Sequence, residues 1–254
     1  MSDSGEAPTL EIEVRDPSRK LEGEQFSHLT GIPLVSSGRV PPGHLRVVFL
    51  ADAVELWDHE CVRRGTRVDF TRIDTRVATG NVSKKQPLAR AVGRHTTQVV
   101  DATTGFGHDA ILLACMGFTV TAIERNPLIH LLLKDAVQRS CDHPELGPIL
   151  SNRFQLKHAD AIQHLQELNF TPDTIYLDPM FESGGSRTAL PQKPAQILRT
   201  LVGADHDSIQ LFDIAIKMAG RVVVKRTDKD PPLAGTPTHS IHGKIVRYDV
   251  YINN

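Results

Sequence analysis

From residue 97 onward, short apolar runs alternate with amphipathic segments, and no other feature constrains the fold of this chain as strongly. The expected strands cover 98–101, 119–123, 154–157, 174–177 and 221–225, and the expected helices cover 109–116, 127–139, 161–168, 195–202 and 208–218. Strands that alternate with helices predict a mainly parallel sheet covered by helices on both faces. The last apolar run, 244–252, follows too soon for a helical crossover, so we expect it to pair antiparallel at the end of the sheet.

The part of the chain before residue 86 has a different pattern. Strand-like runs at 45–50 and 67–73 are separated by turns that contain glycine and proline, and the first twenty residues are polar. We predict a small α+β N-terminal subdomain over residues 1–85, with a loose start, and an α/β domain over residues 86–254. A short helix at 86–92 would lead into the second domain.

The composition is that of an ordinary globular protein, with 40% hydrophobic and 23% charged residues. The longest apolar stretch, 47–57, contains Asp52 and Glu55 and is too short to cross a membrane. The three cysteines form no CxxC pair and the chain opens without a signal peptide, so we expect a cytoplasmic location and neither a disulfide framework nor a zinc ribbon. None of the twelve histidines has a ligand spacing such as HExxH, and we expect no metal.

A glycine-containing turn follows the first strand of the α/β domain, in the sequence DATTGFGHDA that begins at Asp101. Gly105 and Gly107 allow the backbone to approach a ligand more closely than a Cβ would permit. The next strand ends at Glu124, whose carboxylate can accept hydrogen bonds from both ribose hydroxyls of an adenosine. The same residues also fit the dinucleotide pattern GxGxx[GA], with Glu124 following Gly105 by 19 residues, so a nicotinamide-dependent oxidoreductase is an open alternative.

The fourth strand ends in the sequence Asp178-Pro179-Met180-Phe181. It resembles the [DN]PP[YF] signature of methyltransferases that act on the amino groups of bases or on the glutamine amide. Such an amine is a poor nucleophile because its lone pair is delocalised. The Asp178 carboxylate and the Pro179 carbonyl could accept its two N–H bonds and turn the lone pair toward the methyl group, while Phe181 could stack on the base. An Asp-Pro pair also ends strands for structural reasons alone, but an oxidoreductase leaves this motif unexplained.

A further polar position follows the third strand, at Asp160 and Ala161. In enzymes that use adenosylmethionine, a polar residue here commonly contacts the adenine amino group. Asp160 could also cap the helix that follows, and the two roles are compatible.

Together these motifs resemble the bacterial 16S ribosomal RNA guanine-N2 methyltransferase family, of the small-subunit methyltransferase J type. The matching sequences are DATTGFGHDA, IERNP, LDPMF, RTLVG and VVVKRTDKDPPLAG. The family implies a class I, Rossmann-like methyltransferase fold, S-adenosyl-L-methionine as the donor, and the exocyclic N2 amine of a guanine in 16S ribosomal RNA as the acceptor. The resemblance assigns to the donor site His108, Asp109, Glu124, Arg125, Asp160, Ala161 and Asp178, and the glycine turn adds Asp101, Gly105 and Gly107.

The sequence departs from the family pattern in two places. Thr103 stands where the general class I motif has its first glycine, and Met180 replaces the second proline of the amino-methyltransferase signature. Residues 1–60 match none of the motifs, so a substrate-docking role for the N-terminal subdomain is an expectation from its position.

Although the formal net charge is −1, residues 61–95 hold nine basic and only two acidic residues. A basic stretch can attract phosphate, although it is more commonly a solvated surface. We expect Lys84, Lys85, Lys225 and Arg226 to contact RNA. The expected partner is 16S ribosomal RNA or the small ribosomal subunit, without a membrane or an obligate protein partner. Methylation of DNA or of a protein glutamine, and an inactive RNA-binding module, are further alternatives.

Overall fold

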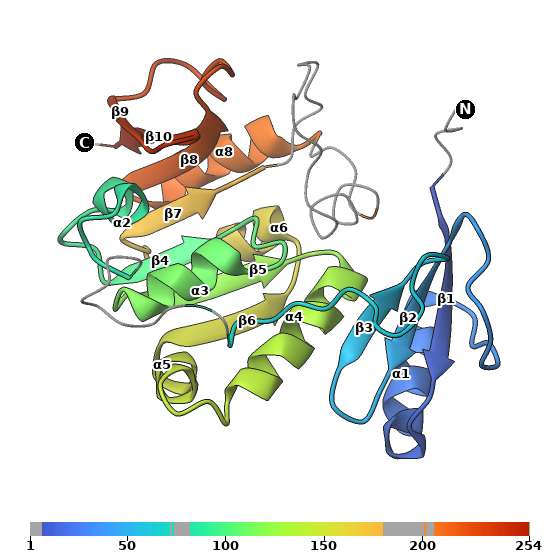
Figure 1. Cartoon of the computed structure of the whole chain (residues 1–254). Helices are drawn as coiled ribbons and strands as arrows, with labels where there is room; N and C mark the ends of the chain where they lie inside the picture. Colours follow the sequence, from blue (N-terminus) through green and yellow to red (C-terminus); the bar gives the residue numbers. More distant parts are fainter. Residues whose placement is uncertain (1–6, 72, 74–81, 180–200, 202–205, 254) are drawn as a thin grey trace. The chain divides into compact units, whose positions relative to one another are not determined.

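The computed structural model describes residues 7–71, 73, 82–179, 201 and 206–253, which belong to two compact units. The N-terminal unit comprises residues 1–69, 131–139 and 184–203, and the sheet unit comprises residues 70–130, 140–183 and 204–254. Figure 1 shows the helices and strands of both units in chain order.

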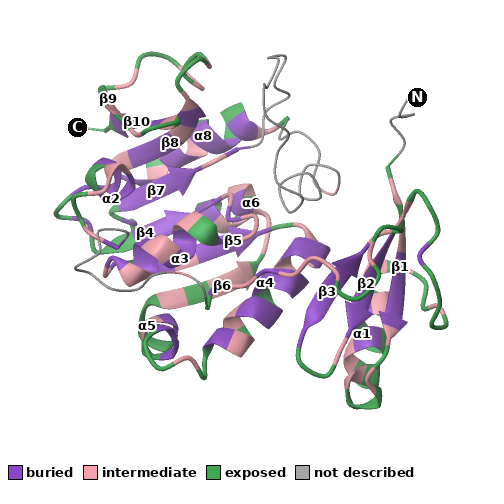
Figure 2. Ribbon diagram, viewed as in Figure 1, coloured by how far each residue is buried: buried purple, intermediate pink, exposed green. Residues whose placement is uncertain are grey.

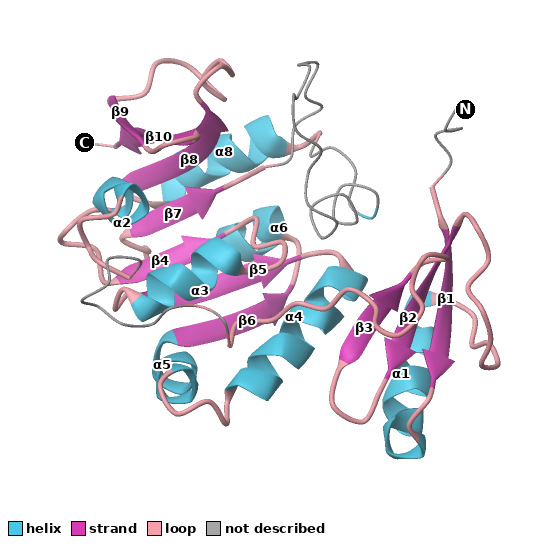
Figure 3. Ribbon diagram, in the orientation of Figure 1, coloured by secondary structure: helices cyan, strands magenta, loops and turns pink. Residues whose placement is uncertain are grey.

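The N-terminal unit contains a three-stranded sheet in the order β1-β2-β3, with one helix beside it (Figure 3). Its elements are β1 (Thr9–Val14), the 3₁₀ turn η1 (Pro17–Arg19), α1 (Lys20–Thr30), β2 (His44–Phe49) and β3 (Val54–Trp57). β1 pairs parallel with β2, which requires a crossover, and α1 provides it. The ring of Phe26 on α1 packs 6.3 Å from that of Phe49 on β2, and Gly31 ends the helix with a left-handed φ of 72°.

The start of the chain is more ordered than its polar sequence predicts. Residues 1–6 lie outside the described residues, but the expectation of a loose start is wrong for 9–14, which form β1. Glu11 and Glu13 belong to this polar stretch, and both are buried. Arg46 on β2 neutralises them, with nitrogen–oxygen distances of 2.7 Å to Glu11 and 2.9 Å to Glu13. The charged residues of β1 are therefore satisfied by a partner on the neighbouring strand.

The strand expected at 67–73 is also wrong for its described residues. Val68 and Phe70 are buried, as their apolar character suggests. However, the nearest strand pairing is an isolated bridge between Thr66 and Leu56. The alternating pattern in this segment reflects the burial of two side chains and does not reflect a ladder of backbone hydrogen bonds.

The sheet unit is built on a seven-stranded sheet in the order β6-β5-β4-β7-β8-β10-β9. Its strands are β4 (Gln98–Asp101), β5 (Thr119–Glu124), β6 (Phe154–His158), β7 (Thr174–Leu177), β8 (Arg221–Thr227), β9 (His239–His242) and β10 (Val246–Ile252). The first five strands of this order are parallel, whereas β10 pairs antiparallel with both β8 and β9, as expected for the last strand. From β4 the chain adds β5 and β6 on one side and then β7 and β8 on the other, so the strand order changes direction at β4. A crevice is therefore expected beyond the carboxyl ends of β4, β5 and β7.

Helices cover both faces of this sheet, whose strands are largely buried (Figure 2). The helices after residue 86 are α2 (Pro87–Val92), α3 (His108–Cys115), α4 (Pro127–Ser140), α5 (Leu146–Arg153), α6 (Ala161–Gln166) and α8 (Ser208–Met218), and residues 131–139 of α4 belong to the N-terminal unit. Side chains of α2 and α3, such as Leu88 and Leu113, pack on one face, and those of α6 and α8, such as Leu165 and Phe212, pack on the other. This is the doubly covered, mainly parallel α/β architecture that the sequence predicts.

Two elements of the sheet unit were not expected, α5 and the short edge strand β9. Gly147 and Pro148 indicate a turn, but both lie in the first turn of α5, where a missing N–H removes no helical hydrogen bond. The helix expected at 195–202 lies outside the described residues apart from residue 201. Among the described residues, no helix is long and apolar enough to cross a membrane.

Candidate active site

The turn between β4 and α3 has a left-handed backbone at both of its glycines. Gly105 has a φ of 54° and Gly107 a φ of 77°, values that side chains other than glycine rarely adopt. Gly107 directly precedes α3, so the turn ends where this helix begins. At the beginning of the turn, the Asp101 carboxylate accepts the Thr103 N–H at 3.1 Å. This conformation explains why glycine stands at both positions.

Glu124 holds the glycine turn from the end of β5. Its Oε2 accepts the N–H of Gly105 at 2.9 Å, and its Oε1 accepts the N–H of Asn126 at 2.7 Å. Each carboxylate oxygen can accept more than one hydrogen bond, so these backbone contacts are compatible with the predicted contact to a ribose. Glu124 therefore shapes the turn as well, a role that the sequence did not reveal.

Asp178 follows β7 and is tied to the same turn. Its backbone N–H donates to Thr103 Oγ1 at 2.6 Å. Thr103 is the residue that departs from the general glycine motif, and its hydroxyl explains why a threonine is useful there. Pro179 is buried, while Met180 and Phe181 lie outside the described residues.

A cluster of carboxylates surrounds Lys225 of β8 at this edge of the sheet. Lys225 Nζ lies 2.8 Å from Asp109 Oδ2 and 2.9 Å from Asp178 Oδ2. The buried Tyr176 hydroxyl donates to the same oxygen of Asp109 at 2.5 Å. Asp109 lies in α3, Tyr176 in β7, Asp178 just after β7, and Lys225 in β8. We refer to these four residues and Asp101 as the lysine–carboxylate cluster.

Burial and charge perturb the titration of this cluster. Burial raises the pKa of Asp101 well above its ordinary value, and the negative charges of Asp109 and Asp178 raise it further. Burial disfavours the Lys225 ammonium, but Asp178 and Asp109 outweigh that effect and raise the pKa of Lys225. Burial also raises the pKa of Tyr176, to which Asp109 adds. Lys225 is thus a cation beside two carboxyl groups, and the larger number of acidic side chains in the cluster favours a positively charged ligand group.

An S-adenosyl-L-methionine donor fits these residues. Its sulfonium and amino groups are positive and match the excess of carboxylates. Its ribose matches an acidic side chain at the end of the second parallel strand, where Glu124 lies. The left-handed backbone at Gly105 and Gly107 is one that residues with a Cβ rarely adopt, so the turn keeps two residues without side chains next to the predicted donor.

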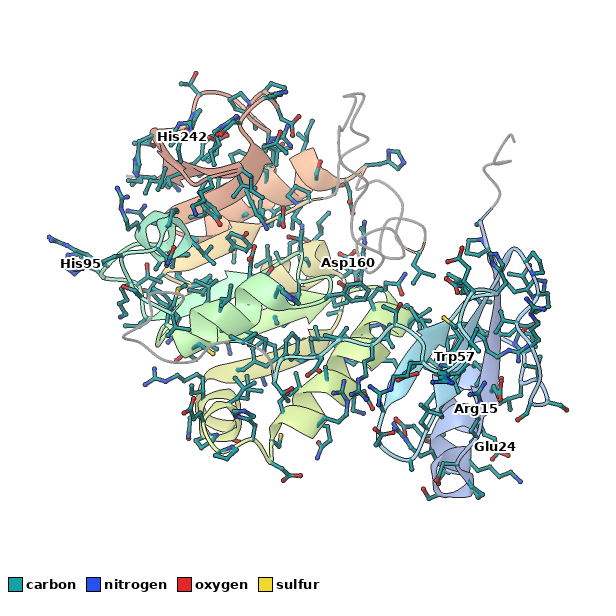
Figure 4. The ribbon with its side chains drawn as sticks, in the orientation of Figure 1. Arg15, Glu24, Trp57, His95, Asp160 and His242 are labelled. Carbon is teal, nitrogen blue, oxygen red and sulfur yellow. The ribbon has the colours of Figure 1, made fainter. Side chains whose placement is uncertain are left out.

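Asp160 and Ala161 lie at the start of α6, where Figure 4 labels Asp160. The Asp160 side chain accepts the Gln163 N–H at 3.0 Å, which confirms its expected role as a helix cap. The predicted contact of Asp160 with an adenine amino group stays a prediction.

Arg125 follows Glu124 at the end of β5, near His130 of α4 and His158 at the end of β6. Arg125 pairs with Asp207, at 2.6 Å between Nη1 and Oδ2. His158 Nε2 lies 3.2 Å from the Arg125 carbonyl oxygen, and the His158 ring stacks on that of His130 with 4.8 Å between centroids. These contacts order the backbone next to Glu124.

The four residues expected to contact RNA have different surroundings. Lys84 and Lys85 are exposed, with the Lys84 ammonium 5.1 Å above the Phe118 ring. Lys225 belongs to the lysine–carboxylate cluster. Arg226 is buried, and its Nε donates to the Pro231 carbonyl at 3.0 Å. The exposed pair is therefore better placed for phosphate than the other two.

A cavity of about 470 Å³ adjoins the cluster within the sheet unit. Its walls include His108 and Asp109 of α3, Tyr248 of β10 and Gln86 before α2. His108, expected at the donor site, lines this cavity and contacts the Phe70 ring edge-on, with 6.0 Å between centroids. Among the described residues, no group of three histidine, cysteine or acidic side chains could hold a metal ion.

Comparisons with known proteins agree with this geometry. The family profile described as "Putative SAM-dependent methyltransferase" matches residues 41–253. The Ribosomal RNA small subunit methyltransferase J of Aeromonas hydrophila is 36% identical over 255 residues, which cover 96% of this chain and 98% of that protein. The protein of the same name from Pectobacterium atrosepticum is 42% identical over 172 residues, which cover 66% of this chain and 69% of that protein.

A solved structure is similar over nearly the whole chain. The crystal structure of a SAM-dependent methyltransferase from Neisseria gonorrhoeae superimposes with a TM-score of 0.70 at 29% identity, covering 95% of both chains. The class I methyltransferase fold expected from the motifs is confirmed. These matches also include most of the N-terminal unit, which the motifs alone did not align.

Proposed function

This chain belongs to the family of the Ribosomal RNA small subunit methyltransferase J proteins, within the SAM-dependent methyltransferases, and we propose that it methylates the exocyclic N2 amine of a guanine in 16S ribosomal RNA. The observation that carries the proposal is the position of Asp178. It lies at the end of β7, bonded to the glycine turn through Thr103 and paired with Lys225. A partly exposed carboxylate next to a donor site suits the orientation of an amine.

In the proposed reaction, Asp178 and Pro179 orient the acceptor. The Asp178 carboxylate and the Pro179 carbonyl accept the two N–H bonds of the amine, which directs the nitrogen lone pair at the methyl carbon. The bound donor supplies a methyl group on a positive sulfur, and the electron pair of the broken C–S bond stays on that sulfur. The nitrogen gains the methyl group and a positive charge, and it then releases one proton to Asp178 and from there to solvent. Phe181 would stack on the base.

The donor would lie across the carboxyl ends of β4, β5 and β6. Glu124 would accept hydrogen bonds from the ribose hydroxyls, Asp160 and the backbone of Ala161 would contact the adenine, and the turn at Gly105 and Gly107 would also hold the donor. The remaining residues assigned to this site are Asp101, His108, Asp109 and Arg125. The negative cluster around Lys225 would attract the positive groups of the donor.

The RNA would be held outside the catalytic cluster. Lys84 and Lys85 are exposed cations and would contact phosphate. The N-terminal unit would dock the substrate, and the protein would act in the cytoplasm.

A methyl-transfer assay tests the proposed function. Small ribosomal subunits from a strain that lacks this protein are incubated with radiolabelled donor, and the RNA is digested to nucleosides. Labelled N2-methylguanosine in 16S RNA is the expected product. Donor binding without any incorporation into this RNA would contradict the proposal and direct the search to DNA bases and protein glutamine.

A further inference from the structure

The proposed orientation of the amine by Asp178 and Pro179 does not involve Lys225, yet Lys225 contacts Asp178 directly. Its ammonium lies between Asp109 Oδ2 and Asp178 Oδ2, at 2.8 and 2.9 Å. The two carboxylates differ in access, because 41% of the Asp178 side chain is exposed and only 20% of the Asp109 side chain. The ammonium therefore connects a more enclosed carboxylate with the open one that we assign to the acceptor.

The enclosed side of this bridge is anchored. Tyr176 is a buried residue, only 1% exposed. Its hydroxyl donates to the same Asp109 oxygen that Lys225 contacts. Asp109 itself belongs to the first turn of α3. With Asp109 fixed by a buried tyrosine, the position of the ammonium is determined from the protein interior, and Asp178 is held against it.

We propose that Lys225 is a positioning residue for methyl transfer, whose ammonium keeps the Asp178 carboxylate ionised and oriented toward the acceptor amine. The inference rests on the proposed function and adds a residue that acts through Asp178 without touching the acceptor. It takes the place of the phosphate contact predicted for Lys225, because an ammonium between two carboxylates is already neutralised.

The other charges around Lys225 explain why its own charge matters. Among the described residues, the titratable groups that face it are Asp109 from α3, Asp178 after β7, Asp101 at the end of β4, Tyr176 of β7 and Tyr248 of β10. Among these groups and Lys225, the lysine has the only positive charge. Without it, Asp109 and Asp178 would repel each other and one of them would take up a proton. A protonated Asp178 would be a weaker acceptor for the amine N–H. It also could not receive the proton that the amine releases.

Kinetics of the full-length Lys225→Met protein test the inference, with small ribosomal subunits as substrate. We expect kcat to fall roughly 10- to 100-fold, while the KM for subunits and the affinity for S-adenosylhomocysteine, measured by calorimetry, stay nearly unchanged. Lys225→Arg should recover part of kcat because it restores the charge. Lys217→Met is the matched control, since it removes an exposed lysine from α8. Unchanged kcat, or a raised KM with unchanged kcat, would overturn the inference, and the latter would restore the phosphate contact.

The pH profile separates a positioning role from a merely structural one. The ammonium stabilises the ionised form of Asp178, so its removal allows the carboxylate to take up a proton at higher pH. The acid limb of kcat should therefore move to higher pH in Lys225→Met and stay in place in Lys217→Met. An acid limb at the same pH in both variants would contradict the inference.

The charge state of Asp178 can also be measured in the protein without RNA, so this test does not depend on which acceptor is methylated. The ¹³C carboxyl signal of Asp178, identified by its loss in Asp178→Asn, is titrated by NMR in the wild type and in Lys225→Met. We expect its midpoint to rise in the variant, and an unchanged midpoint would overturn the inference. If the methionine variant does not fold, Lys225→Gln carries the same test. A wild type that fails to methylate 16S RNA would refute the proposed function alone, because the titration does not depend on it.

Discussion

Each unit of this protein contains a cation between two carboxylates, at nearly the same distances. In the N-terminal unit, the Arg46 guanidinium lies 2.7 Å from Glu11 and 2.9 Å from Glu13. In the sheet unit, the Lys225 ammonium lies 2.8 Å from Asp109 and 2.9 Å from Asp178. Distance alone therefore does not distinguish the two arrangements.

Their enclosure does distinguish them. The side chains of Arg46 and Glu13 are 5% and 1% exposed, whereas 41% of Asp178 is exposed. Arg46 also contacts Glu11 through two nitrogens and donates to the Gly38 carbonyl, so its rigid guanidinium has several partners. A shielded cation with many acceptors fixes the backbone around it. A cation with one open partner can hold a side chain that must also meet a substrate.

The largest effect is expected at the open carboxylate. Asp178→Ala should lower methyl transfer by at least about 10³-fold, because the amine loses the acceptor that orients it. The unfolding free energy should change by less than about 1 kcal/mol, since the side chain is partly exposed and Lys225 keeps Asp109. The methyl-transfer assay and urea unfolding measure the two quantities. Turnover within tenfold of the wild type in a folded variant would refute the role of Asp178.

The enclosed cation should give the opposite result. Arg46→Met should lower the unfolding free energy by roughly 3 kcal/mol, because the buried Glu11 and Glu13 lose the cation between them, while Glu13 keeps Arg15 at 2.6 Å. Trp57, the single tryptophan, lies in the N-terminal unit, where the Arg15 guanidinium is 4.1 Å from its ring centroid (both are labelled in Figure 4), so its fluorescence in urea reports on this unit.

Arg67→Met is the control for Arg46→Met. Arg67 pairs with Asp52 at 3.4 Å, but 76% of the Asp52 side chain is exposed. We expect a change within about 0.5 kcal/mol in this variant, as for other exposed pairs. If Arg46→Met lowered the unfolding free energy no more than Arg67→Met does, the Arg46 pairs with Glu11 and Glu13 would not stabilise the N-terminal unit.

The donor side of the sheet unit should show an intermediate effect. Glu124→Gln should weaken donor binding by about 10- to 100-fold, because one of the two oxygens that accept the N–H groups of Gly105 and Asn126 becomes an NH₂ donor and the charge is lost. Calorimetry with S-adenosylhomocysteine measures the affinity, and Glu167→Gln, at an exposed position after α6, is the control. Equal affinities in the wild type and Glu124→Gln would remove the ribose contact from the proposed function.

The parallel sheet and the order of its motifs could be predicted because their signals are local. A short apolar run followed by a glycine turn indicates a strand and the helix after it, and β4 and β7 were predicted with the bounds that the structure has. Glu124 and Asp178 were found for the same reason, since each directly ends a strand. Parallel strands bring their carboxyl ends to one edge, so the meeting of these residues followed from the fold class.

The partners of Arg46 and Lys225 could not be predicted, because they depend on strand order. Lys225 is separated from Asp178 by 47 residues and from Asp109 by 116, and a lysine at the end of a valine-rich strand looks exposed. The loose start predicted for the polar first residues is wrong for β1 for the same reason, because Arg46 of β2 lies between Glu11 and Glu13. In both units, the neutralising partner of a charged residue is distant in the sequence, so the pair forms only once the strand order is known.

Exposed cations complete the comparison and should give the smallest effect. Lys84→Glu with Lys85→Glu should leave stability and donor affinity unchanged but weaken RNA binding, with the loss shrinking as salt rises. If each lysine contacts one phosphate, the slope of log affinity against log salt should fall in magnitude by roughly 1.4 to 1.8, a value that fluorescence anisotropy with a 16S RNA fragment can measure. Lys217→Glu on α8 should leave that slope in place. A loss that does not depend on salt would mean that Lys84, which packs over Phe118, acts through the structure of the sheet unit and not through phosphate.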